Sequence, residues 1–260
     1  MINIRSTEEI ELLRESNILV SKTLAEVAKL IKPGITTEAL DKRAEEYILD
    51  HKAIPGFKGY NNYPKTLCTS INSQVVHGIP GNVVLQEGDI ISVDCGVILN
   101  KYYGDSAYTF AVGEISESVK KLLRTTKESL FSGVEQAIEG KRVGDISFAV
   151  QVYCENSGYS VVREMVGHGL GTNLHESPEV PNYGKRGTGP SLKKGMVICI
   201  EPMINMGSKR IFQERDGWTI RTHDNKPSAH FELAVAIDKD KADILSTFLY
   251  IEEVLGNREF

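Results

Sequence analysis

The first segment of the chain carries apolar residues at the spacing of an α-helix. Ser6-Thr7-Glu8-Glu9 matches a capping box, the Ser-x-x-Glu pattern that opens many helices. Asn17 is the one polar interruption of the apolar face behind it, which comprises Ile10, Leu13, Val20, Leu24, Val27 and Ile31. Pro33-Gly34 is expected to end this helix.

Later segments alternate between helical periodicity and the apolar runs that are typical of strands. Ile90–Val97 and Tyr102–Val112 predict two strands joined around Asn100-Lys101. Helix pairs followed by strands, twice over, favour an α+β fold over an alternating βαβ fold. The remaining expected elements are helices at Thr37–Asp50, Ser116–Glu139 and Asp145–Asn156 (capped by Asp145), strands at Ser160–Val166, Met196–Glu201 and His230–Ile237, and an ordered loop at Ile54–Tyr63.

One order of motifs occurs twice along the chain. Each copy contains a His-Gly pair, a Leu-x-x-Gly turn, and two carboxylates on predicted strands. Leu-x-x-Gly alone is common and can recur by chance, but the whole order favours an internal duplication. We therefore expect one domain over residues 1–260, built of two pseudo-symmetric halves (about 1–113 and 114–260) with a site between them. The members are His77, Leu85-x-x-Gly88, Asp94 and Asp105 in the first copy, and His168, Leu192-x-x-Gly195, Glu201 and Glu232 in the second.

Composition narrows the class of protein. With 41% hydrophobic and 25% charged residues among 260, the chain is typical of a globular domain and not of a disordered or fibrous one. No apolar run is long enough to span a membrane, and no secretory signal is visible at the start. A net charge of −5 argues against nucleic acid as the main ligand. Four cysteines without a CxxC pair are expected to be reduced thiols, so we expect a cytoplasmic protein.

The four strand carboxylates are the strongest chemical signal. Each is expected in a largely buried strand, where a carboxylate is costly unless it is paired or binds metal. A single one is more simply a salt-bridge partner or an edge-strand residue. Four of them together with His168 favour a two-metal site for Mn, Fe, Co or Zn, in which a shared water is activated as a hydroxide nucleophile. The candidate ligands are Asp94, Asp105, His168, Glu201 and Glu232.

Two further histidines are candidates for contact with substrate. A lone histidine is more often structural, but His175 follows His168 within a glycine-rich stretch that permits unusual backbone geometry. Such a loop could aim one imidazole at metal and the other at substrate. His77 belongs to the first copy of the repeated order. His51 and His223 are expected at the surface.

These residues resemble the type I methionine aminopeptidases over nearly the whole chain. The most specific segment runs from Met165-Val166-Gly167-His168-Gly169-Leu170-Gly171-Thr172-Asn173-Leu174-His175 to Val180-Pro181-Asn182-Tyr183. The resemblance implies the duplicated pita-bread fold, an antiparallel sheet with outer helices and a metal site between the halves. Five shorter segments are also similar: Val76-His77-Gly78-Ile79-Pro80, Gly88-Asp89-Ile90, Tyr103-Gly104-Asp105-Ser106, Ile200-Glu201-Pro202-Met203 and Asp216-Gly217-Trp218-Thr219.

The resemblance also implies roles for individual residues. Asp94 and Asp105 would bind one metal ion, and Asp105 and Glu232 would bridge to a second ion completed by His168 and Glu201. His77 and His175 would contact the substrate and stabilise the tetrahedral intermediate. A methionine pocket would be lined by Tyr60, Tyr63, Cys68 and Trp218, and a monovalent cation would lie near Asn72 and Ser228. The chain departs from relatives at Phe57, Leu174 and His230.

The implied activity is removal of the initiator methionine from nascent proteins whose second residue is small. Partners would be nascent N-termini near the ribosome exit, with no membrane and no nucleic acid as main ligand, and the enzyme would be a monomer. Two alternatives remain: an Xaa-Pro peptidase or creatinase-like enzyme, and an inactive binding module on the same fold. The Xaa-Pro enzymes usually carry an extra N-terminal domain, and inactive relatives lose ligands, whereas all five are present here.

Overall fold

A long antiparallel hairpin forms the centre of the computed structural model, which describes residues 2–256 and 260. Its strands are β4 (Ile90–Leu99) and β5 (Tyr102–Ala111). They pair without a register shift, from Ile90 opposite Ala111 to Leu99 opposite Tyr102. Asn100 and Lys101 turn the chain with φ of 51° and 73°. Two left-handed residues are typical of the tight turn that suits the twist of a hairpin. The two strands predicted from the sequence are thereby confirmed.

The described strands form two larger and two smaller sheets. Within each sheet, neighbouring strands pair in antiparallel orientation. The hairpin joins β1 and β2, and a five-stranded sheet has the order β15-β14-β9-β7-β8. The other strands and their bounds are β1 (Ile54–Pro55), β2 (Leu67–Ile71), β3 (Gln74–Val76), β6 (Ser160–Val161), β7 (Gly167–Gly169), β8 (Glu176–Val180), β9 (Val197–Ile200), β10 (Met203–Asn205), β11 (Ile211–Gln213), β12 (Ile220–Thr222), β13 (Ser228–His230), β14 (Leu233–Ala236) and β15 (Asp243–Ile244).

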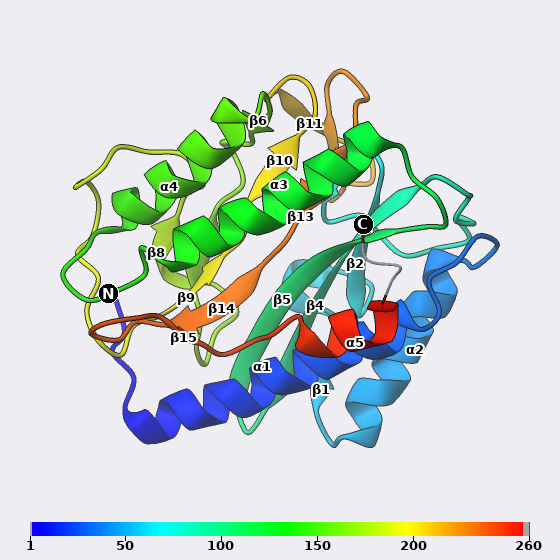
Figure 1. The fold of residues 1–260 in the computed structure, drawn as a ribbon. Coiled ribbons are helices and arrows are strands. Elements are labelled where there is room, and N and C mark those ends of the chain that lie inside the picture. The colour runs from blue at the N-terminus through cyan, green and yellow to red at the C-terminus, as the bar shows by residue number, and fades with distance from the viewer. Residues whose placement is uncertain (1, 257–259) are drawn as a thin grey trace.

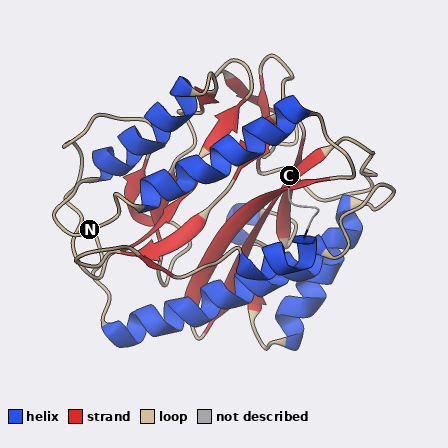
Figure 2. Cartoon of the chain, viewed as in Figure 1, coloured by secondary structure: helices blue, strands red, loops and turns tan. Residues whose placement is uncertain are grey.

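Helices cover the outer faces of the sheets, so the fold is α+β as predicted (Figure 1 and Figure 2). The hairpin packs against α1, and the strands β9, β10 and β13 pack against α3. No helix among the described residues has the length and apolar character to cross a membrane. The helices are α1 (Thr7–Ala28), α2 (Thr37–Asp50), the short 3-10 turn η1 (Tyr60–Asn62), α3 (Glu117–Val134), α4 (Val143–Asn156) and α5 (Leu249–Leu255).

Local hydrogen bonds explain where the helices begin and end. The capping box of α1 is confirmed, because the Glu9 N–H donates to Ser6 Oγ and the Ser6 N–H donates to Glu9 Oε2. The prediction that Asp145 caps α4 is wrong. Arg142 is the N-cap residue, and the Asp145 carboxylate accepts its N–H from inside the first turn at 2.8 Å.

Three predicted elements are shorter than expected. The helix predicted to Glu139 ends at Val134, because the Glu139 N–H pairs instead with the Asp238 carbonyl at 2.9 Å. The strand predicted over Ser160–Val166 pairs with β10 only at its first two residues. The strand predicted over His230–Ile237 breaks into β13 and β14. The break is caused by Glu232, whose N–H leaves the ladder and donates to Ala107 of the hairpin at 2.9 Å.

The break at Glu232 also joins the two larger sheets. Glu232 forms a bridge with Ala107, so the end of β14 meets the middle of β5. The division into pseudo-symmetric halves at about residue 113 stays a prediction. Residues 1 and 257–259 of the predicted domain lie outside the described residues.

Candidate metal centre and substrate cavity

The hairpin places two carboxylates on one face of the sheet. Asp105 lies opposite Gly96, and Asp94 is two positions from Gly96 on the same strand. Side chains two apart on a strand share a face, so the two aspartates are diagonal neighbours.

The α1 helix fixes the backbone at Asp105. The buried Asn17 side chain accepts the Asp105 N–H at its Oδ1, at 3.1 Å. A Cβ at Gly104 would come within 2.5 Å of the Ser16 carbonyl carbon, so only glycine lets the helix approach this closely. The polar interruption in the first helix is therefore a support for the predicted site.

The other three predicted ligands come from three separate segments. His168 lies in β7, Glu201 follows β9, and Glu232 precedes β14. His168 Nε2 is 3.7 Å from Asp105 Oδ2 and 3.6 Å from Glu201 Oε1. Its Nδ1 is 3.0 Å from the Gly169 carbonyl. That contact suits a proton on Nδ1, which leaves the Nε2 lone pair for a metal ion.

Electrostatics test whether the cluster fits a divalent cation. Burial raises the pKa of Asp94 to about 6. Burial and repulsion from Glu232 and Asp94 raise the pKa of Asp105 well above its usual value, and burial with nearby carboxylates does the same for Glu201 and Glu232. Burial lowers the pKa of His168 to about 3, so its imidazole is neutral.

Several oxygens of the cluster are orphaned. Among the described residues, Asp94 Oδ1, Asp105 Oδ1 and Glu232 Oε1 are buried without a hydrogen-bond partner. Crowded carboxylates with unpaired oxygens and a neutral imidazole are the ligand set of a divalent metal site, since the cation would relieve both their repulsion and their desolvation.

Two residues of the cluster were not predicted as ligands. One group whose ligand atoms all lie within 4.8 Å of one another contains Asp105, His168, Cys199 and Glu232, and another contains Glu201, His230 and Glu232. The period of two along a strand could have found both, because Cys199 lies two before Glu201 and His230 lies two before Glu232. His230 Nε2 is 3.5 Å from Glu201 Oε2.

A cavity of about 350 Å³ opens over this cluster and brings the predicted residues together. All five predicted ligands line it, as do both predicted substrate histidines and all four predicted pocket residues. The departures Phe57 and Leu174 also face it. Lining residues that sequence reasoning missed are Asn61, Val76, Glu164, Met165, Val166 and Met203.

The two histidines predicted to contact substrate line the cavity together with the carboxylates. His77 has φ of 61°, a left-handed backbone that is strained for a residue with a side chain and that often marks a functional site. The His175 ring lies 4.3 Å from the His168 ring, measured between centroids, and its Nδ1 is 2.8 Å from the Tyr60 hydroxyl. Burial lowers the pKa of His77 to about 4.

Aromatic residues form the cavity wall. The Tyr63 hydroxyl donates to the carbonyls of Leu67 and Gly78, and its ring meets Trp218 edge-on at 5.0 Å between centroids. Since these hydrogen bonds anchor Tyr63, the wall beside His77 is held by the backbone.

The two residues predicted near a monovalent cation are neighbours. The Ser228 N–H donates to the Asn72 carbonyl at 2.9 Å. The Asn72 side chain donates from Nδ2 to Asp89 Oδ1 and accepts the Ile90 N–H at its Oδ1. The Ser228 hydroxyl donates to Asn205 Oδ1 at 2.8 Å. Proximity is thus observed, and cation binding stays a prediction.

Comparison with known proteins identifies the family. Residues 11–239 match the profile of metallopeptidase family M24. The chain belongs to metallopeptidase family M24. The methionine aminopeptidase of Clostridium acetobutylicum is 52% identical to this M24 chain over 247 residues, 95% of this chain and 99% of that relative.

Comparison with solved structures supports the same family and fold. The crystal structure of methionine aminopeptidase from Rickettsia prowazekii matches with a TM-score of 0.94 and 39% identity, covering 95% of this chain and 100% of that one. A prolidase from Pyrococcus furiosus, at 23% identity and a TM-score of 0.73 over 65% of its length, shares the fold alone. The pita-bread fold and the resemblance to type I methionine aminopeptidases are confirmed. Family membership and the ligand cluster together make this M24 chain a divalent-metal protein.

Proposed function

We propose that this M24 chain is an aminopeptidase that removes N-terminal methionine from nascent polypeptides whose second residue is small. The observation that carries the proposal is the buried cluster of four carboxylates and His168 at the floor of a cavity with aromatic walls. The names of the full-length relatives support the choice of substrate.

Asp94 and Asp105 would hold one divalent ion, and His168 and Glu201, together with Asp105 and Glu232, would hold a second. Two such ions would lower the pKa of a shared water and polarise the scissile carbonyl. Cobalt, manganese, iron and zinc all suit these ligands, and cellular supply decides between them. Metal analysis of protein purified from its own cells identifies the ions and their number.

His77 and His175 contact the substrate and act in catalysis. Both are neutral at neutral pH, because burial lowers their pKa values. A neutral imidazole can donate one N–H to the scissile carbonyl as negative charge develops on its oxygen. A Tyr60 hydroxyl that donates to His175 Nδ1 would leave the ring proton on Nε2, the nitrogen that would then donate to the carbonyl oxygen.

The methionine side chain occupies the pocket formed by Tyr60, Tyr63, Cys68 and Trp218. A thioether gains favourable contacts with aromatic rings, whereas a charged first residue would be buried without a partner. Phe57 and Leu174 complete this wall, and the large Phe57 ring leaves no room for a Cβ at Gly96, whose nearest Phe57 atom would be 2.4 Å away.

The experiment that tests the function compares Met-Ala-Ser with Xaa-Pro dipeptides, each with and without chelator. We expect hydrolysis of Met-Ala-Ser only, abolished by the chelator and restored by metal. Hydrolysis of the Xaa-Pro dipeptides instead would make the chain a prolidase-like enzyme, and hydrolysis of neither with metal bound would make it a binding module.

Secondary properties follow from the same proposal. A monovalent cation binds near Asn72 and Ser228, and activity measured in sodium, potassium and tetramethylammonium salts tests it. The enzyme is a cytoplasmic monomer that meets its substrates near the ribosome exit. Size-exclusion chromatography and co-sedimentation with translating ribosomes test these two points.

A further inference from the structure

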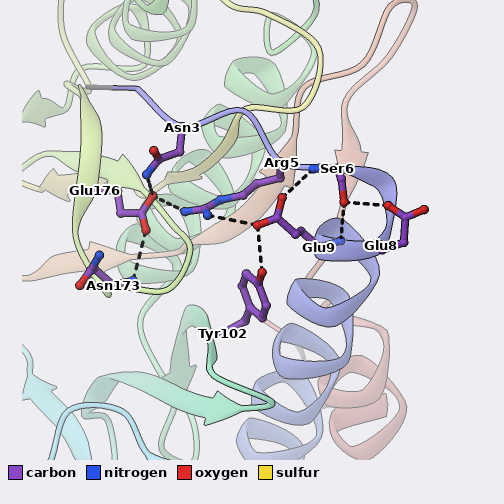
Figure 3. Close-up of polar contacts among 8 residues, drawn as sticks. All are labelled: Asn3, Arg5, Ser6, Glu8, Glu9, Tyr102, Asn173 and Glu176. Atoms are coloured by element: carbon purple, nitrogen blue, oxygen red, sulfur yellow. Dashed lines mark hydrogen bonds and ion pairs between the residues drawn. The ribbon is translucent and has the colours of Figure 1, made fainter.

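The segment that precedes α1 reaches the outer side of the loop that carries His175. The Arg5 N–H donates to the Gly195 carbonyl at 2.7 Å, which fixes the backbone of this segment. The Arg5 side chain is 9% exposed and pairs with Glu176, which is 6% exposed, at 2.5 Å between Nη2 and Oε2 (Figure 3). This ion pair is therefore buried, and Glu176 directly follows His175.

Both oxygens of the Glu176 carboxylate are used. Oε2 also accepts a hydrogen bond from the Asn3 side chain at 2.6 Å, and Oε1 accepts the Asn173 N–H at 3.2 Å (Figure 3). Burial alone would raise the pKa of Glu176, but these donors and the Arg5 charge outweigh it and lower the pKa. Glu176 therefore ties both ends of the turn over residues 173–176 to the N-terminal segment.

A second set of contacts ties the same arginine to the hairpin. Arg5 Nη1 lies 3.5 Å from Glu9 Oε1, which accepts the Tyr102 hydroxyl at 2.9 Å (Figure 3). Tyr102 begins β5, and the next residue, Tyr103, donates its N–H to the Gly171 carbonyl at 2.8 Å. The hairpin strand that bears Asp105 and the loop that bears His175 are thus linked on their outer side.

Gly171 shows how tightly the loop lies on this pair. A Cβ there would be 1.9 Å from Arg5 Nη2 and 2.5 Å from Glu176 Oε1. The turn over residues 171–175 contains no helix or strand, so its position depends on these side-chain contacts and on Tyr103.

We propose that Arg5 and Glu176 are positioning residues that hold the His175 imidazole in place over the carboxylate cluster. The inference rests on the proposed function, in which His175 acts on the scissile carbonyl. Misplacement of a catalytic group by about 1 Å can lower a rate about 10²-fold. Because the pair lies outside the cavity, its loss changes the rate of the chemical step and leaves the metal ligands and the methionine pocket intact.

The variants are Arg5→Met, Glu176→Gln and Arg5→Lys, with Arg14→Met as the matched control. Arg14 lies in α1 and pairs with Asp243 at 2.6 Å, but it does not touch the His175 loop. We expect Arg5→Met and Glu176→Gln to lower kcat about 10- to 100-fold, with unchanged KM and metal content. Arg5→Lys keeps a charge for Glu176 and retains most of kcat, and Arg14→Met behaves as the wild type.

A measurement without substrate separates this inference from the proposed function. In the zinc-loaded protein, ¹⁵N spectra of the histidine rings report the Nδ1 of His175, assigned by its absence in His175→Gln. We expect this resonance to shift in Arg5→Met and Glu176→Gln and to remain in place in Arg14→Met, whatever peptide the enzyme cleaves.

Three results would overturn the inference. The first is an unmoved His175 resonance in the Arg5 and Glu176 variants. The second is a loss of kcat that only follows loss of metal or of folded protein. The third is a fall in kcat for Arg14→Met as large as that for Arg5→Met. Should Arg5→Met fail to fold, Glu176→Gln and Arg5→Lys still decide the matter, because Glu176→Gln is isosteric and removes one charge, whereas Arg5→Lys keeps the positive charge.

Discussion

The hairpin and the C-terminal segments contribute to the same metal site in different ways. The hairpin supplies Asp94 and Asp105 from one continuous ladder closed by a two-residue turn. The C-terminal ligands His168, Glu201 and Glu232 come from short strands far apart in sequence, and contacts such as the bridge at Ala107 and the hydrogen bond from Tyr103 to Gly171 join these segments to the hairpin. One side is therefore a single local hairpin, and the other is assembled by non-local contacts.

The two regions also differ in the contacts that support their site residues. On the hairpin side, side chains of α1 support the ligand strand directly: Asn17 accepts the Asp105 N–H, and the Ser16 hydroxyl donates to the Tyr102 carbonyl. On the C-terminal side the loop after His168 depends on Arg5 and Glu176, which reach it from the beginning of the chain. Segments held by few contacts open at lower free energy than core strands. The C-terminal side is thus where we expect small changes to alter catalysis without unfolding the protein.

Asp105→Asn is the largest expected change, because Asp105 is the hairpin residue that faces the C-terminal ligands. We expect activity to fall more than about 10³-fold, beyond the roughly 10–100-fold that losing a partner of a metal ligand costs. The apoprotein should nevertheless melt at a higher temperature than the wild-type apoprotein, because one buried charge is removed from a repelling cluster. Metal analysis, kinetics and calorimetry measure the three quantities. Full activity with metal bound would contradict the ligand assignment.

His175→Ala tests the C-terminal side without touching the ligands. We expect both metal ions to remain and kcat to fall about 10²–10³-fold, the usual cost of one donor to a developing oxyanion. Single-turnover kinetics on Met-Ala-Ser with parallel metal analysis measure this. Loss of metal instead would mean that the division between ligand and substrate histidines is wrong.

Removal of metal should reveal the electrostatic strain of the cluster. The carboxylates have raised pKa values in the folded apoprotein, about 6 for Asp94, so the folded state binds more protons than the unfolded chain above the ordinary carboxylate pKa. The stability of the apoprotein is therefore lost as pH rises through these raised values. Below about pH 6.5 the buried neutral histidines oppose this effect, because their pKa values are lowered in the folded protein and they charge in the unfolded chain. We therefore expect the apoprotein Tm to fall between about pH 6.5 and about pH 7.5, by about 2–4 °C per kcal/mol.

The metal-loaded protein is the control for that measurement. Bound cations keep the carboxylates ionised in the folded state, so this fall should disappear or reverse on loading. An apoprotein whose Tm is equal at the two pH values would mean that the cluster carries little repulsion.

The sequence predicted the hairpin side more completely than the C-terminal side, for a physical reason. Both hairpin strands and their turn depend on neighbours along the chain, so periodicity and turn residues located them. The break at Glu232 depends on a bond to Ala107, which no local pattern contains. Likewise, the glycine-rich loop made His175 a candidate. The Arg5–Glu176 contact behind it joins residues 171 positions apart, so no local pattern could predict it.

The candidate ligands were found because buried carboxylates are rare without a partner, a rule that needs no knowledge of topology. Their division between two ions and the pocket residues came from the resemblance to a family. Cys199 and His230 were not among the candidate ligands, although each lies two residues before a candidate, the spacing at which strand residues share a face.

Asn17→Ala tests the support of the hairpin. The variant leaves the buried Asp105 N–H without its acceptor, which we expect to cost about 1–3 kcal/mol of unfolding free energy. Thr23→Ala is the matched control, since the Thr23 hydroxyl is buried in the same helix but bonds only to Leu19 within that helix. Denaturant unfolding of the metal-free proteins measures both. Equal losses for the two variants would remove the special role of Asn17.

Tyr60→Phe is the smallest expected change, and it bears on the contact that joins the two regions across the cavity. Tyr60 lies in η1 on the N-terminal side, and its hydroxyl is 2.8 Å from Nδ1 of His175. A net hydrogen bond is worth about 1 kcal/mol, so we expect kcat to fall about fivefold. Binding should change little, because the ring that packs on the methionine side chain is kept.

The control variant is Tyr153→Phe, which removes an exposed hydroxyl bonded to Glu128 and should leave kcat unchanged. If Tyr60→Phe and Arg5→Met act on His175 through independent contacts, their effects on log kcat add in the double variant. An effect smaller than the sum would mean that the tyrosine holds His175 only while the arginine holds the loop.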